Sequence, residues 1–350
     1  MTLHYIGADV HVHNTEISVE NRKKIVNRYS VPTSISAIRD VLKTIPGQKK
    51  MAIEEGPMAG WLYRNLKDDV DELIVCDPKQ NKYIYAGADV DDNIASAKLA
   101  ELLRGGYLKP VYHSMDEQRI EFKQWVSLYR DCIHAGVRQI NQLRAQCRLY
   151  GIKTPRLVIR NTSARQAWLK ELGQPVLARQ LQLLWMGYEA TRQQTKLAKQ
   201  QLVRLSKNYP IIACWKEIPG YGLIRAVTLF AYLDTPWRFK KKTKLWRYCG
   251  MGIRHVTSGK DKQGRPKPAH LALDRQCNRV LKEVVMGAAV SAIGMKRPNI
   301  FKSYYERQCD AGILAANARH SEARKMVSVA WGMWKTKSRF NPSIAMSSDL

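Results

Sequence analysis

The spacing of apolar residues changes twice along this chain of 350 residues. Short β-rich runs alternate with helical patterns at first, a long stretch of purely helical spacing follows, and a second helical pattern interrupted by glycine turns comes last. A period of two belongs to strands and a period of 3.6 to helices, so the spacing restricts each part to one kind of structure. We therefore predict an α/β domain over residues 1–110, a helical coiled-coil or oligomerisation region over 111–209, and a mainly α domain over 210–350.

The first domain is expected to contain a mixed sheet. Its strands are predicted at Leu3–Ile6, Ile17–Val19, Lys24–Tyr29, Met51–Ile53 and Leu73–Cys76, and its helices at Ser34–Lys43, Trp61–Leu66 and Asn93–Leu103. Asp92 is placed to cap the last of these helices. Asp9 and Glu54 are expected at the ends of two strands, where ligands gather in such sheets. Carboxylates supplied by separate segments suit Mg²⁺, which prefers oxygen ligands.

The charge of the chain favours a polyanionic partner. Lys and Arg number 58 against 30 Asp and Glu, a formal net charge of +28. Such basicity attracts nucleic acid through phosphate neutralisation. An anionic membrane is the rival partner, but no window approaches the ~20 apolar residues of a spanning helix, and we expect no membrane partner. The N-terminus has no signal-peptide pattern, and the seven dispersed cysteines form no CxxC pair, so we expect a cytoplasmic protein with reduced thiols.

Two apolar stripes mark the helical region. The first is Phe122, Val126, Tyr129, Ile133, Val137, Ile140, Leu143 and Cys147, and the second is Leu177, Leu181, Leu184, Tyr188, Thr191, Thr195, Ala198, Leu202 and Leu205. The second alternates spacings of four and three, the rhythm of a coiled coil. Two interpretations stay open: an antiparallel hairpin packed on its own core, and an oligomerisation arm.

Glycine turns and basic runs characterise the last domain. Two glycines, Gly220 and Gly222, precede a helix predicted over Leu223–Leu233. This arrangement resembles the turn of helix-hairpin-helix modules, where backbone N–H groups bind a phosphate. The tract 237–246 mixes aromatic residues with five basic ones, among them Lys240, Lys241 and Lys242, which favours contact with a nucleic-acid backbone; a solvated helix face is the alternative.

A loop rich in glycine, lysine and proline follows over residues 250–268, and a helix is predicted from about residue 270. The loop contains one serine, Ser258. A serine hydroxyl is a poor nucleophile unless a base, metal or local field activates it. His255 is a weak candidate for that base, and the composition alone favours an ordinary flexible loop.

The order of the motifs nevertheless resembles a known family, the DEDD insertion-sequence transposases. These are related to the Piv DNA invertase and include the bridge-RNA-guided recombinases. The resemblance spans nearly the whole chain through YIGADVH, IEEGPMAGWLYRNL, LIVCDPKQN, DDNIASAKLAELLRGG, EIPGYGLIRAVTLFAYL, LWRYCGMGIRHVTSG and NRVLKEVVMGAA.

The resemblance implies an enzyme that cuts and rejoins DNA. Its expected parts are an RNase H-like (RuvC-like) domain, a coiled coil, and a transposase domain in which Ser258 attacks a scissile phosphate. The implied cofactor is Mg²⁺. The implied partners are donor and target DNA duplexes, a structured guide RNA, and further copies of the chain in a dimer or tetramer.

The family pattern requires four acids, and this chain offers three. Asp9 resembles the first and Glu54 the second, with Glu55 as a neighbouring alternative. Alignment of the Lys-Leu-Ala motif places Asp92 as the third acid and Ala95 at the position of the fourth. Either Asp89 or Asp91 supplies the missing carboxylate, or the acid has been lost. We favour the loss, because Asp92 and position 95 lie one helical turn apart on the same side.

Basic residues around Ser258 are expected to hold the DNA backbone. They are Arg254, Lys260, Lys262, Arg265 and Lys267, followed by Arg275 and Arg279 on the next predicted helix. The leading hypothesis is a transposase or recombinase impaired at Ala95. The alternatives are an Mg²⁺-dependent junction nuclease that does not need Ser258, and a domesticated nucleic-acid-binding protein without catalysis.

Overall fold

The computed structural model describes residues 2–77, 92–256, 263, 265 and 270–345. By their internal contacts these form two compact units, unit 1 over residues 1–117 and unit 2 over residues 118–350. The helical region and the last predicted domain both belong to unit 2, and the division of the chain into three domains stays a prediction. Within the described ranges, no helix is long and apolar enough to cross a membrane.

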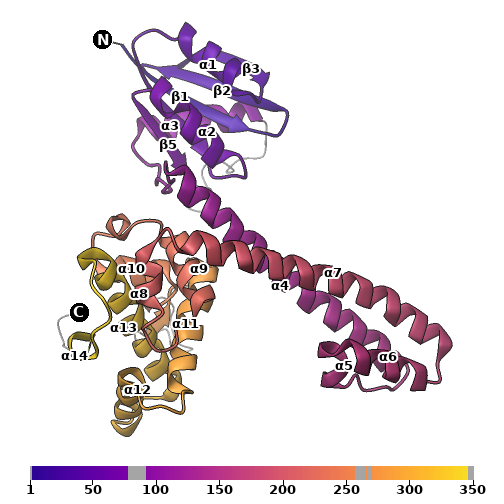
Figure 1. The fold of residues 1–350 in the computed structure, drawn as a ribbon. Helices are drawn as coiled ribbons and strands as arrows, with labels where there is room; N and C mark the ends of the chain where they lie inside the picture. The colour runs from indigo at the N-terminus through magenta and orange to yellow at the C-terminus, as the bar shows by residue number, and fades with distance from the viewer. Residues whose placement is uncertain (1, 78–91, 257–262, 264, 266–269, 346–350) are drawn as a thin grey trace. The chain divides into compact units, whose positions relative to one another are not determined.

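In its described residues, unit 1 contains a five-stranded sheet and three α-helices, whose arrangement is drawn in Figure 1. The elements are β1 (Leu3–Val10), β2 (Asn14–Asn21), β3 (Lys24–Pro32), α1 (Ile35–Thr44), β4 (Gln48–Glu54), α2 (Ala59–Leu66), the short 3-10 helix η1 (Lys67–Asp69), β5 (Glu72–Cys76) and α3 (Asp92–Arg104). Every predicted strand and helix is present, and the strands are longer than predicted. Helix α3 includes Asp92 as its first residue, where a cap was expected.

The sheet is mixed, with the strand order β3-β2-β1-β4-β5. Strands β1, β2 and β3 pair antiparallel, whereas β4 runs parallel to both β1 and β5. The parallel register pairs Ala8 of β1 with Ile53 of β4, so Asp9 and Glu54 follow at the carboxyl ends of two neighbouring strands. The α/β class predicted for this part of the chain is confirmed.

The two faces of this sheet bury different residues. Ile6, Ala8 and Ile53 pack with α1 and α2 on one face. Ala52 and Cys76 pack with α3 on the other. Since side chains alternate across a strand, Asp9 and Glu54 belong to the face that α3 covers.

Unit 2 is predominantly helical, as predicted. Its elements are α4 (Glu117–Leu149), α5 (Arg156–Arg160), α6 (Thr162–Glu171), α7 (Pro175–Ser206), α8 (Pro210–Trp215), α9 (Leu223–Leu233), η3 (Pro236–Arg238), α10 (Lys242–Tyr248), β6 (Ile253–Val256), β7 (His270–Leu273), α11 (Arg279–Ile293), α12 (Ile300–Asp310), α13 (Ala315–Thr336) and α14 (Pro342–Ala345). Helix α9 has the predicted bounds, because its apolar run fits burial on nearly every side.

The largest core of the described residues joins α8, α9, α10, α11 and α13 to the beginning of α4 and the end of α7. Phe122 of α4 meets Phe230 of α9 edge to face, with ring centroids 5.5 Å apart. Trp215 of α8 donates its indole N–H to the carbonyl of Ala330 in α13 at 2.7 Å. These contacts anchor the base of the helical hairpin in the C-terminal part of the chain.

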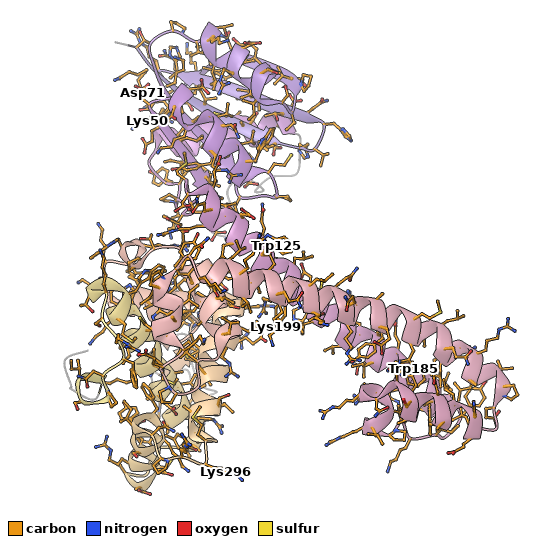
Figure 2. The ribbon with its side chains drawn as sticks, viewed as in Figure 1. Lys50, Asp71, Trp125, Trp185, Lys199 and Lys296 are labelled. Atoms are coloured by element: carbon orange, nitrogen blue, oxygen red, sulfur yellow. The ribbon has the colours of Figure 1, made fainter. Side chains whose placement is uncertain are left out.

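Helices α4 and α7 form a long antiparallel hairpin, with α5 and α6 at its far end (Figure 1). A second core lies at that end, where Trp185 of α7 meets Trp168 of α6 at 6.0 Å between ring centroids. Figure 2 labels Trp125 on α4 and Trp185 on α7. The hairpin therefore has a core of its own, as one of the two interpretations required.

The predicted stripe of α4 is wrong at two positions. Ile133 and Val137 are exposed, and Gly136 faces α7 instead, where an added Cβ atom would lie 3.8 Å from a methyl carbon of Thr191. The stripe predicted on α7 is buried or half-buried throughout.

The helix predicted from residue 270 begins only at Arg279. Residues His270–Leu273 form β7, which pairs antiparallel with β6, so that Val256 lies opposite His270. Asn278 then caps α11 by accepting a hydrogen bond from the backbone N–H of Leu281 at 3.0 Å. Part of the predicted loop at 250–268 is accordingly strand β6, and Arg275 lies in the turn before α11.

Candidate functional site

Unit 1 places two of the predicted acids at one edge of the sheet. Asp9 is the penultimate residue of β1 and Glu54 the last residue of β4. The Asp9 side chain is 21% exposed, and its Oδ2 lies 3.3 Å from Nε2 of His11. Glu54 is half-buried. Both side chains belong to the α3 face at the carboxyl end of the parallel strands.

Helix α3 approaches this edge because β1 carries a glycine. A Cβ atom on Gly7 would lie 2.0 Å from the carbonyl oxygen of Ser96, so only glycine allows the contact. The hydroxyl oxygens of Ser18 and Ser96 are 2.7 Å apart and buried. At the other end of α3, Arg104 pairs with Glu20. The helix thus runs antiparallel to β1. It begins at the carboxyl ends of β1 and β4, where Asp9 and Glu54 lie, and we call this end of the sheet the acidic edge.

The third predicted acid, Asp92, is therefore carried toward the other two by the helix start. Its backbone lies one turn before Ser96. Its side chain lies outside the described part of the structure, as do Asp89 and Asp91. The topology brings the segments of Asp9, Glu54 and Asp92 to the same end of unit 1.

Ala95 packs against the sheet. It is half-buried against an apolar cluster that includes Ala52 and Cys76. Ala52 lies two residues before Glu54 on the same face of β4, so a carboxylate at position 95 would face the acidic edge. In this chain a methyl group occupies the position, and its assignment to the fourth acid stays a prediction.

Glu55 differs from Glu54 in its contacts. It follows β4 and is exposed, and its Oε2 lies 2.7 Å from Nε2 of His113. The His113 ring in turn lies 5.6 Å from that of Tyr63. Glu55 is thus held by a histidine away from the α3 face.

Asp9 and Glu54 supply carboxylate oxygens, the kind of ligand that a hard cation prefers. Carboxylate oxygens on two strand ends suit Mg²⁺. Among the residues whose side chains the structure describes, no group of three or more His, Cys, Asp or Glu could hold a metal ion. The cofactor therefore stays a prediction.

Unit 2 contains a basic pocket of about 610 Å³ beside the β6–β7 pair. Its described lining residues are Thr243, Lys244, Trp246, Arg247, Gly252, Ile253, Arg254, Asp274, Arg275, Gln276 and Arg324. This lining contains five cationic side chains and one carboxylate, that of Asp274. The pocket therefore suits an anion such as a phosphate.

Arg247 and Arg324 are held in place by the fold. Nε of Arg247 lies 2.5 Å from Oδ2 of Asp274. Nε of Arg324 donates to the carbonyl of Met251 at 2.8 Å. Burial lowers the pKa of the Arg324 guanidinium, so an anion beside it would relieve the cost of its desolvation.

Sequence reasoning identified only part of this pocket. Arg254 and Arg275 were predicted, and both line it. Lys244, Arg247 and Arg324 were missed, because α13 supplies Arg324 from a point far along the chain. The sequence offers a local signal only in the pair of basic residues Arg324 and Lys325, which precedes the apolar run that begins at Met326.

The remaining predicted residues are distributed differently. Arg265 and Arg279 are exposed, and Lys240, Lys241 and Lys242 line a separate groove. Ser258, Lys260, Lys262 and Lys267 lie outside the described residues. The described ends of β6 and β7, Val256 and His270, show only where the serine-containing segment leaves and rejoins the sheet.

The two glycines of the turn before α9 have different surroundings: Gly220 packs against α11, whereas Gly222 is exposed. Gly220 has φ +88°, and a Cβ atom there would lie 2.2 Å from the carbonyl oxygen of Ala288 in α11. Arg225 donates to the carbonyl of Gly220 at 2.8 Å and to the hydroxyl of Ser291 at 2.9 Å. Gly222 is exposed at the beginning of α9. Gly220 is thus required by the fold itself, whereas Gly222 is open to a ligand.

Comparison with protein families identifies this part of the chain. Residues 213–306 match the transposases of the IS116/IS110/IS902 family. No curated protein matches the chain. The match runs from α8 into α12 and includes the glycine turn and most of the basic pocket. Unit 2 therefore carries a transposase domain, and the predicted resemblance to insertion-sequence transposases is confirmed. The match of residues 213–306 to the IS116/IS110/IS902 family supports a role in DNA recombination and binding to DNA.

Proposed function

We propose that this chain is an insertion-sequence transposase whose reaction passes through a covalent bond between Ser258 and DNA. The observation that supports this proposal best is the match of residues 213–306 to the transposase family. The serine-containing segment is attached to β6 and β7, whose neighbouring residues line the basic pocket. Arg247 and Arg324 would hold a phosphate oxygen there.

The proposed reaction conserves the number of phosphodiester bonds. Oγ of Ser258 loses its proton and attacks a backbone phosphorus, so that a serine–phosphate bond forms and a phosphorus–oxygen bond to the sugar breaks. The leaving sugar oxygen takes up a proton. A sugar hydroxyl of a second DNA strand then attacks the serine phosphate and releases Ser258, which joins the strands without an external energy source.

The acidic edge of unit 1 would hold the metal for this reaction. We assign Asp9, Glu54 and Asp92 as its ligands, and we prefer Glu54 to Glu55 because Glu55 contacts His113. When bound, Mg²⁺ would offset the negative charge that develops on the phosphate. The sheet with acids at the ends of its central strands also supports the proposed RNase H-like identity of unit 1.

Ala95 supports a second proposal, that this chain is catalytically impaired. One carboxylate fewer weakens the hold on a cation, while the basic residues that bind DNA are unaffected. A nucleic-acid-binding protein without catalysis is the limiting case. A guide RNA as partner belongs to the first proposal, that of a transposase or recombinase, and would select the donor and target duplexes by base pairing. We expect the protein to contact mainly the backbone and the shape of the nucleic acids.

The test compares the unchanged chain with Ala95→Asp in Mg²⁺-dependent DNA cleavage. We expect the variant to be at least about 10-fold faster, because loss of support to a metal site costs on the order of 10- to 100-fold. Equal rates would contradict the assignment of position 95. Adding Ser258→Ala should then abolish strand exchange; retained cleavage would identify a nuclease, and no cleavage with Ser258 intact would identify a binding protein.

A further inference from the structure

A surface of unit 2 combines tryptophan and lysine side chains from two separate segments. We call it the tryptophan–lysine surface, and it consists of Trp237, Lys240, Lys241, Lys242, Trp331 and Lys335. Part of it is a groove of about 530 Å³, lined in the described chain by Lys240, Lys241, Lys242, Thr243, Ser328, Trp331, Gly332, Lys335 and Thr336. No acidic side chain is among these described lining residues.

Lys335 connects the two indole rings. Its Nζ lies 3.6 Å from the centroid of the Trp331 ring and 5.4 Å from that of Trp237. Trp331 is fixed by its indole N–H, which donates to the carbonyl of Pro236 at 2.7 Å. Pro236 precedes Trp237 in the 3-10 helix η3, so the same contact also fixes the position of Trp237.

Trp237 is nevertheless 70% exposed. An indole is among the largest apolar side chains, and one that the fold positions while leaving it in water is available to a partner. The ammonium of Lys335 lies over one face of the ring. A flat, electron-rich group on the protein surface beside four lysines fits a ligand that has flat rings and repeated negative charge.

We propose that the tryptophan–lysine surface binds an unpaired stretch of DNA, with a base stacked on Trp237 and the phosphates held by Lys240, Lys241, Lys242 and Lys335. Bases within a duplex already stack on each other and cannot offer a face to the ring, whereas unpaired bases can. This inference rests on the proposed function, because strands must separate for recombination. We choose DNA because the family of the domain implies DNA binding.

The experiment measures binding of the full-length chain to labelled oligonucleotides without Mg²⁺, so that catalysis does not enter. The probes are a single DNA strand, its duplex, the same strand without bases, and an RNA strand of the same sequence. We expect Trp237→Ala to weaken binding of the single DNA strand by about 5- to 100-fold, the effect of losing one stacked base. The same substitution should change the affinity for the duplex by less than twofold, and the affinity for the abasic strand by less than twofold as well.

Matched variants separate stacking from charge and from folding. Trp237→Phe keeps an aromatic ring and should retain most of the affinity for the single strand. Trp61→Ala removes an exposed tryptophan from unit 1 and should change nothing. Lys335→Met should weaken binding to every probe and should reduce the salt dependence of that binding. Thermal melting of each variant checks that it is folded; Trp237→Phe provides a folded comparison if Trp237→Ala is not.

Several results would overturn the inference. They are an affinity of Trp237→Ala for single-stranded DNA equal to that of the unchanged chain, an equal loss on the abasic strand, and a loss confined to RNA. If the unchanged chain binds duplex DNA but Trp237 has no effect on the single strand, only this inference fails. If the unchanged chain binds none of the DNA probes, the proposed function fails with it.

Discussion

Glu322 lies in α13 with its side chain fully buried. Neither carboxylate oxygen has a hydrogen-bond partner in the described structure. Burial raises the pKa of this carboxyl to about 8 from its usual 4.5. Between these two pH values the folded protein keeps a proton that the unfolded chain has released, so stability must fall as the pH rises through this window.

Substitution of Glu322 by glutamine should remove this dependence. We compare the free energy of unfolding of Glu322→Gln with that of the unchanged chain. As the pH rises from 5 to 8, we expect the difference to change by about 1–3 kcal/mol in favour of the variant. Denaturant unfolding at a series of pH values measures the difference. Glu306→Gln is the control, because Glu306 is exposed on α12 and its loss should leave the two profiles parallel. Parallel profiles for Glu322→Gln would refute the account.

Individual residues were predicted well where their local pattern was sufficient. Asp9 and Glu54 could be placed at strand ends because the strands themselves have clear apolar patterns. Arg324 could not be assigned to the basic pocket, since its role depends on α13 packing beside Met251. Glu322 gave no signal either, because a glutamate in a helical pattern is normally on the exposed side.

Helix α7 presents a second apolar stripe beside the one that packs on α4. The residues Val176, Leu183, Ala190 and Leu197 are exposed at intervals of seven, and each immediately precedes a member of the inner stripe. A heptad interval on an exposed face is the pattern of a helix that packs against another helix. We propose that this stripe joins copies of the chain into a dimer or tetramer.

A charge within the stripe should therefore separate the copies. Leu183→Lys is expected to lower the molar mass measured by light scattering to that of the monomer, because burial of a lysine at a helix contact is unfavourable. Leu128→Lys introduces the same change on an exposed position of α4 and should leave the assembly intact. An unchanged chain that is already monomeric would rule out the stripe as an interface.

Elements with long, regular patterns were the most predictable. Helix α9 and all five strands of unit 1 follow from apolar spacing alone. Strand β7 did not, because four residues are too few to distinguish a strand from the beginning of a helix, and only pairing with β6 decides. The contact face of α4 was also predicted incorrectly. The spacing of apolar residues favours the large side chain of Ile133, whereas Gly136 faces α7, and only the packing of the two helices decides between them.

At the scale of the whole molecule, the proposed reaction uses two compact units. The acidic edge belongs to unit 1, whereas Ser258 and the basic pocket belong to unit 2. The family of unit 2 could be recognised from motif order, since glycine turns and apolar helices recur at fixed places. The metal ligands depend on side chains beyond the described residues and stay a prediction.

The most direct test of the central claim is to identify the atom that bonds to DNA. Ala95→Asp would be incubated with Mg²⁺ and a labelled DNA duplex, denatured and digested, and the peptides would be analysed by mass spectrometry. We predict a nucleotide attached to the peptide that contains Ser258, in much lower yield for the unchanged chain and absent from Ala95→Asp combined with Ser258→Ala. DNA cleavage by Ala95→Asp without any adduct, or an adduct on another residue, would contradict it.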